Sequence, residues 1–262
     1  MATSPRKPLF VLAVVALLAA LALGGYAVVR ARAAGGGAAQ TPAIVPTASP
    51  SAAATAAPRY ERWLVGKATA PVVVRTRPSP DAAVKTRLSV RNQNGYPSLV
   101  LVDDVRQAGG ATWYLVKVAM RPNGSRGWVR EGTLALYTTA ARIVIDLSER
   151  RLRTYRRNEL VGEYPVAVGR PGLETPTGEY FINQKLRPPR PGGPYGALAI
   201  GISAFQPKLA HWEQGGPVAI HGTNEPWLIG KAVSHGCVRM RDKDVLAVGR
   251  TVPAGSPVFI EE

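Results

Sequence analysis

The chain has 262 residues but only one cysteine, three histidines and four phenylalanines. A single cysteine excludes an intramolecular disulfide framework and any metal site built from cysteines alone. Acidic residues are also scarce, because 17 Asp and Glu stand against 33 Lys and Arg, a net charge of +16. So basic a chain favours an anionic partner, which could be nucleic acid, lipid headgroups or an acidic polymer. Hydrophobic residues make up 46% of the chain, which excludes a wholly disordered protein.

Charged residues are absent from residues 9–29, a run rich in Leu, Val and Ala. As a helix this run would measure about 30 Å, enough to cross a bilayer core. Two basic residues precede it, and no acidic residue occurs before Glu61. The pattern predicts that residues 1–33 are a transmembrane signal anchor, with the rest of the chain outside the cytoplasm. Ala31-Arg32-Ala33 offers the alternative of a cleaved, secreted form, and a buried core helix is a further alternative.

Residues 34–58 also lack charge and consist largely of Ala, Gly, Thr, Ser and Pro. Such a composition cannot bury a core, so we expect a linker that gives the following domains reach from the membrane.

Residues 59–139 show short runs of β-branched and aromatic residues separated by turn residues. Four or five strands at this spacing predict a small antiparallel barrel or sandwich, with Trp113 and Trp128 in its core. The pattern resembles bacterial SH3-like domains. The runs concerned are 71–75, 98–102, 113–118 and 127–129.

Residues 140–262 are predicted to be rich in strands as well, so the expected fold class is mostly β. Residues 142–147 and 163–169 alternate as half-buried strands do, and 257–260 form a last short strand. The best helix candidate is 242–249, with Asp242 as its N-terminal cap.

Two of the three histidines lie within 16 positions of the only cysteine, Cys237. A thiolate is the nucleophilic form of cysteine, and a nearby imidazole such as His221 or His235 can generate it. Gly236 allows a tight turn, where backbone N–H groups would stabilise an oxyanion. Arg239 would bind a carboxylate or favour the thiolate. One alternative is an inert buried thiol beside structural histidines.

A second alternative is a metal site built from His221, His235 and Cys237, with His211 as an optional fourth ligand. The short ligand pairs typical of zinc sites are absent from the sequence, which disfavours this alternative.

The segment His221-Gly222-Thr223-Asn224, followed by Ile229-Gly230 and by residues 233–240 (VSHGCVRM), resembles the signature of L,D-transpeptidases with a YkuD-type catalytic domain. Residues 175–181 (TPTGEYF) are similar to that family's upstream T-P-x-G-x-[FY] segment, and residues 145–155 are similar to its opening strands. The resemblance covers roughly residues 140–260.

The resemblance implies a mostly β catalytic domain that acts on peptidoglycan stem peptides outside the cytoplasmic membrane. A cysteine attacks the carbonyl of the third stem residue, terminal D-alanine leaves, and an amine of another stem resolves the acyl-enzyme into a 3→3 cross-link. Water as acceptor would instead give L,D-carboxypeptidase activity. No metal or organic cofactor is implied.

Residue roles follow from the same resemblance. Cys237 matches the nucleophile, and His221 matches the group that accepts and returns the proton. His235 and Gly236 match residues that shape the catalytic site. Positions associated with substrate binding are Ser234, Arg239 and Gly222. The residues alone leave open which histidine is the base.

The basic charge has three interpretations: binding to cell-wall polymers, binding to nucleic acid, or a solvated basic surface with no dedicated partner. Residues 59–139 carry 13 basic and 5 acidic residues, a net +8, which fits anionic cell-wall polymers. Nucleic acid is not an expected partner, because the basic residues are scattered and the anchor denies access.

A non-catalytic wall-binding protein remains an alternative function, and we expect a monomer.

Overall fold

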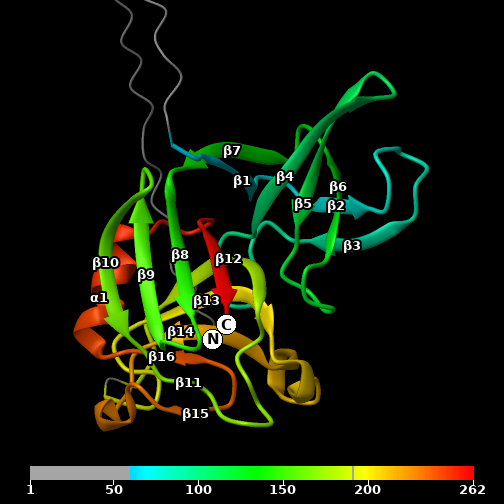
Figure 1. Cartoon of the computed structure of the whole chain (residues 1–262). Helices are drawn as coiled ribbons and strands as arrows, with labels where there is room; N and C mark the ends of the chain where they lie inside the picture. Colours follow the sequence, from blue (N-terminus) through cyan, green and yellow to red (C-terminus); the bar gives the residue numbers. More distant parts are fainter. Residues whose placement is uncertain (1–59, 191) are drawn as a thin grey trace, which may run out of the picture. The chain divides into compact units, whose positions relative to one another are not determined.

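The computed structural model describes residues 60–190 and 192–262, and β-strands dominate this part of the chain (Figure 1). The mostly β fold class is therefore confirmed. The predicted anchor (1–33) and linker (34–58) lie outside the described residues. Within the part that is described, no helix is both long enough and apolar enough to span a membrane.

The first sheet has seven strands in the order β3-β2-β6-β5-β4-β1-β7, and every pairing in it is antiparallel. Four of the strands, β2, β4, β5 and β6, overlap the four predicted runs to within one residue at each end of a run. The likeness to SH3-like domains stays a prediction. The strands are β1 (Trp63–Ala68), β2 (Val72–Arg75), β3 (Val84–Leu88), β4 (Leu99–Ala108), β5 (Ala111–Lys117), β6 (Arg126–Arg130) and β7 (Leu134–Thr139).

Trp113 and Trp128 are buried in this sheet's core, as predicted. They are 2% and 8% exposed and pack with Ala111, and a neighbouring cluster of valines on β2, β4, β5 and β6 continues the core. Burying large aromatic and β-branched side chains on one face is what stabilises a small sheet of this kind.

The second sheet has eight strands in the order β10-β9-β8-β17-β12-β13-β14-β16. Two pairings are parallel, β17 with β8 and β14 with β16, and the others are antiparallel. Its strands are β8 (Ala141–Asp146), β9 (Arg151–Arg156), β10 (Glu159–Pro165), β12 (Gly178–Leu186), β13 (Ala199–Phe205), β14 (Pro217–His221), β16 (Val238–Arg239) and β17 (Pro257–Glu261). A separate parallel pair is formed by β11 (Val168–Gly169) and β15 (Ala232–Ser234).

The predicted helix is present as α1 (Asp242–Thr251), but its predicted cap is wrong. The N-cap is Arg241, which makes no side-chain capping hydrogen bond. Asp242 is the first helical residue, and its Oδ1 accepts a hydrogen bond from the Ala197 N–H at 3.1 Å. The carboxylate therefore fastens a distant loop instead of capping its own helix.

The two sheets belong to one compact unit and share apolar packing. Phe181 of β12 is fully buried with Val65 of β1 and Leu101 of β4. Beside this cluster the ammonium of Lys117 lies 2.5 Å from the Glu179 carboxylate. The chain crosses from the first sheet to the second between β7 and β8, so the two sheets are joined both by the chain and by side-chain contacts.

Candidate active site

His221 ends β14, and Cys237 directly precedes β16, the strand that pairs with it in parallel. In this pairing His221 lies opposite Arg239. Cys237 is two positions before Arg239, so alternation along the extended segment directs both side chains to the same side of the sheet. Strand pairing thus brings the predicted base and nucleophile to one face, although they are 16 positions apart in the sequence.

A tight turn presents Cys237. The buried Ser234 hydroxyl accepts a hydrogen bond from the Gly236 N–H at 3.1 Å and donates one to the Cys237 carbonyl at 2.5 Å. Gly236 has φ +115°, and a Cβ added to it would lie 2.7 Å from Nε2 of Gln206. Glycine is required here by backbone conformation and by close approach. Ser234 therefore shapes the turn, and its contact with substrate stays a prediction.

His221 is 3% exposed, and its Nδ1 lies 2.6 Å from the carbonyl oxygen of Gly222. Because a carbonyl oxygen only accepts hydrogen bonds, Nδ1 carries the proton and Nε2 is left as the basic nitrogen. Burial lowers the pKa of His221 to about 4, against the opposing effect of the Gly222 hydrogen bond. The imidazole is therefore neutral near pH 7 and able to accept a proton. The ring of Tyr195 covers it at a centroid distance of 5.0 Å.

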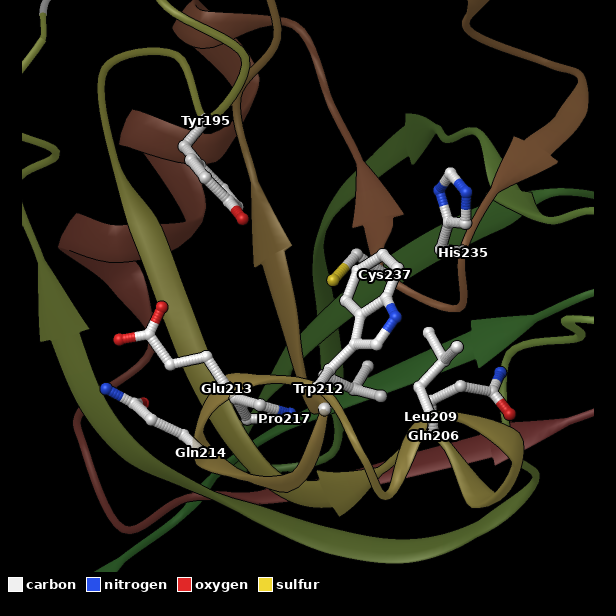
Figure 2. A pocket seen from close by; sticks show the side chains of 11 residues that line it. Tyr195, Gln206, Leu209, Trp212, Glu213, Gln214, Pro217, His235 and Cys237 are labelled. Atoms are coloured by element: carbon white, nitrogen blue, oxygen red, sulfur yellow. The ribbon is translucent and has the colours of Figure 1, made fainter.

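The thiol of Cys237 opens into a cavity of about 330 Å³. Figure 2 shows the sulfur directed between Tyr195 on one side and Trp212 and His235 on the other. The rings of Trp212 and His235 are 5.4 Å apart. A second cavity of about 320 Å³ is also lined by Cys237 and Tyr195, so the thiol lies where two cavities meet.

Burial raises the pKa of the Cys237 thiol, and a backbone hydrogen bond at Ala219 and the charge of Arg239 oppose this effect. The resting group is accordingly a protonated thiol near pH 7. A nucleophilic sulfur then needs a base, and the neutral His221 on the neighbouring strand has the chemistry for it.

Two further predicted residues, Arg239 and Gly222, lie close to His221 in the chain or in the sheet but do not line the 330 Å³ cavity. Arg239 forms an ion pair with Glu225, with Nη1 2.8 Å from the carboxylate. Gly222 is packed so tightly that an added Cβ would lie 2.1 Å from Oδ1 of Asp242. Substrate binding by either residue stays a prediction.

Sequence reasoning did not count the aromatic and amide groups of the pocket among the site residues. Tyr195, Gln206 and Trp212 lie on loops, where no periodicity marks them, and they reach Cys237 only through the fold. Short-range patterns carry no signal for such contacts.

Across residues 60–190 and 192–262, no group of three or more His, Cys, Asp or Glu side chains has the arrangement of a metal site. The alternative in which the histidines and Cys237 hold a metal ion therefore has no geometric support in this part of the chain.

Comparisons with known proteins agree on the family. Over 123 residues the chain is 45% identical to YkuD of Bacillus licheniformis, named a candidate L,D-transpeptidase, and this match covers 47% of the chain and 67% of that protein. YkuD of Bacillus subtilis is 40% identical over 124 residues, which cover 47% of the chain and 68% of that protein.

Among solved structures, the chain is similar to L,D-transpeptidase 3 from Mycobacterium tuberculosis in complex with a faropenem-derived adduct. The identity is 16% and the TM-score 0.38, over 62% of this chain and 98% of that one. So distant a likeness carries no conclusion on activity.

The family model described as the L,D-transpeptidase catalytic domain, YkuD, matches residues 140–260, which contain Cys237 and Trp212 of the 330 Å³ cavity and the buried His221. By this match and by its identity to the two Bacillus proteins, the chain belongs to the YkuD family of L,D-transpeptidases.

Proposed function

We propose that this protein is a peptidoglycan L,D-transpeptidase that forms 3→3 cross-links through a thioester on Cys237. The observation that carries the proposal is the Cys237 thiol at the junction of two cavities, directly before the strand that pairs with β14, which ends at a neutral His221. Family membership supports the same reaction class.

The first half-reaction transfers an acyl group to sulfur. Nε2 of His221 takes the thiol proton while the sulfur attacks the carbonyl carbon of the third stem residue. The tetrahedral intermediate collapses, the carbon–nitrogen bond to D-alanine breaks, and His221 returns the proton to the leaving amine. A thioester on Cys237 and free D-alanine result.

A developing oxyanion needs a backbone donor at this step. The Gly236 N–H already donates to the Ser234 hydroxyl. The Cys237 N–H is therefore the better candidate of the two groups that flank the turn.

The second half-reaction needs room for another stem. Its side-chain amine attacks the thioester, the carbon–sulfur bond breaks, and the amine's proton returns through His221 to the sulfur. The two cavities that meet at Cys237 favour transfer between two stems over simple hydrolysis, because donor and acceptor would approach the thioester from separate sides.

We also propose that the chain is held in the membrane by residues 9–29, with its catalytic domain on the outer side. The basic residues 59–139 would then lie close to carboxylates and phosphates of the wall. Protease treatment of intact spheroplasts tests this topology, because digestion of the catalytic domain is expected only if it lies outside.

The activity is tested with the full-length chain in mild detergent, incubated with a tetrapeptide stem and followed by mass spectrometry. We expect a Cys237 thioester, free D-alanine and a cross-linked dimer. D-alanine without dimer would indicate a carboxypeptidase instead. Binding to purified sacculi with neither thioester nor D-alanine would overturn the enzymatic proposal in favour of a wall-binding protein.

A further inference from the structure

Residues 206–216, here called the 206–216 loop, join β13 to β14 and form one wall of the Cys237 cavity. In Figure 2 the labelled side chains of this loop, Gln206, Leu209, Trp212, Glu213 and Gln214, line the lower side of the pocket. The two ends of the loop meet, since the Gln206 N–H donates to the Gly216 carbonyl at 2.9 Å. Its interior has only short turns, η1 (Pro207–Leu209) and η2 (Glu213–Gly215), so its position depends on what holds its ends.

Arg121 holds those ends, and it belongs to the first sheet's part of the chain, between β5 and β6. Its Nη2 donates to the Gln206 carbonyl at 2.5 Å and to the Gly215 carbonyl at 2.6 Å. Nε donates to the same Gly215 carbonyl at 3.1 Å. A planar guanidinium that binds both ends of a loop fixes its orientation more firmly than one point contact would.

Asn123, two positions further on, secures the strand from which the loop departs. Its Oδ1 accepts a hydrogen bond from the Phe205 N–H and its Nδ2 donates to the Phe205 carbonyl, both at 2.8 Å. Both backbone groups of the last β13 residue are thus bound by one side chain. The segment 121–123 is therefore hydrogen-bonded both to the last residue of β13, from which the loop begins, and to the two ends of the loop.

The loop in turn touches the catalytic turn. The Gln206 side chain donates to the Glu174 carbonyl at 2.7 Å, and the amide lies so close to Gly236 that a Cβ there would be 2.7 Å from its Nε2. Trp212 of the same loop packs against His235. A continuous series of contacts therefore runs from Arg121 through Gln206 to the residue before Cys237.

We propose that Arg121 is a positioning residue of this enzyme, which holds the 206–216 loop against the catalytic turn so that the acyl donor is aligned with the Cys237 sulfur. Arg121 lies outside the residues 140–260 that match the family, so the preceding domain would supply part of the active-site support. The proposal rests on the proposed function, since it assigns a role in the acylation step. Small misplacements of a reacting pair cost up to about a hundredfold in rate.

The test compares the full-length protein with Arg121→Ala, Arg121→Lys and, as a matched control, Arg130→Ala, an exposed arginine of the same sheet. Two rates are measured on each: thioester formation with a tetrapeptide stem over a range of concentrations, and alkylation of Cys237, the only cysteine, by iodoacetamide. Arg121→Ala should acylate on the order of tenfold to a hundredfold more slowly. Its alkylation rate should be unchanged or higher, because so small a reagent needs no aligned loop. Arg121→Lys should restore part of the acylation rate, and Arg130→Ala should match the parent protein.

The proposal is overturned if Arg121→Ala acylates at the parent rate. It is also overturned if acylation and alkylation fall in proportion in both Arg121 variants, which would indicate general damage. If the parent protein itself forms no thioester, the proposed function fails separately. The role of Arg121 in holding the loop is then tested by acrylamide quenching of Trp212 fluorescence. The Trp212 signal is the fluorescence of each protein minus that of the same protein carrying Trp212→Phe. Quenching should increase in Arg121→Ala, and equal quenching would reject the assignment.

Discussion

The two sheets differ in how they are assembled. Every pairing in the first sheet is antiparallel, and β4, β5 and β6 follow one another both in sequence and in space. In the second sheet β17 inserts between β8 and β12, and β16 returns parallel to β14. The catalytic candidates His221 and Cys237 lie at that last parallel pairing. The connection between β5 and β6 of the simpler sheet nevertheless holds the loop beside Cys237, so the chemistry of one region depends on the support of the other.

The largest effect is expected from Cys237→Ala, which would remove the proposed nucleophile from the second sheet. Thioester formation should fall to zero and D-alanine release to the uncatalysed level, as measured by mass spectrometry. Cys237→Ser, which keeps the size and a weaker nucleophile, is the control. An acyl adduct on any other residue of Cys237→Ala would contradict the assignment of the site.

Substituting each histidine in turn shows which of the two acts as the general base. His221→Ala should slow acylation by at least about a hundredfold, because general-base catalysis is commonly worth that much or more. His235 packs against Trp212 at the cavity wall, so His235→Ala should cost less. Acylation rates of the two variants provide the measurement. A larger loss in His235→Ala would show that the base was assigned to the wrong ring.

Phe181→Ala tests whether the two sheets form one cooperative unit. The side chain is fully buried between them, and its truncation should lower the free energy of unfolding by about 3–5 kcal/mol. Chemical denaturation followed by fluorescence and by circular dichroism measures this. Leu160→Ala, at an exposed position, should change stability by less than about 0.5 kcal/mol. Separate transitions in the parent protein would mean that the sheets are independent.

Acidification should act through the second sheet's part of the chain, because all three histidines follow residue 210 and none lies in the first sheet. Burial lowers the pKa of His221 from 6.5 to about 4, so between these values the unfolded chain binds a proton that the folded chain does not. The contribution of His221 to stability is therefore fully present above pH 6.5 and falls by up to about 3 kcal/mol as the pH approaches 4. Unfolding free energies at pH 7 and pH 4 measure the loss.

His221→Gln is the control for this pH dependence, since it keeps a polar side chain that does not titrate. Its stability should fall less than that of the parent protein over the same interval. Equal losses in both proteins would assign the pH dependence to other groups.

Much of the fold could be predicted because local alternation decides which face of a strand is buried. Residues 142–146 of the predicted strand alternate between buried and half-buried positions in β8, and Trp113 and Trp128 occupy the predicted core. The helix was also predictable, but the partner of Asp242 was not. Its carboxylate binds the Ala197 N–H, 45 positions earlier, and no local rule identifies such a partner.

The amino-acid sequence shows which chemical groups are available to this protein: one thiol, a histidine in each of two short motifs, and a glycine where the backbone must turn. Those features are local in the chain, so a linear pattern reveals them. Three further properties follow from the packing of the fold: His221 is buried and neutral, Trp212 and Tyr195 flank the thiol, and Arg121 binds both ends of the 206–216 loop. These properties arise from burial and from contacts between distant segments, which depend on how the two sheets pack together.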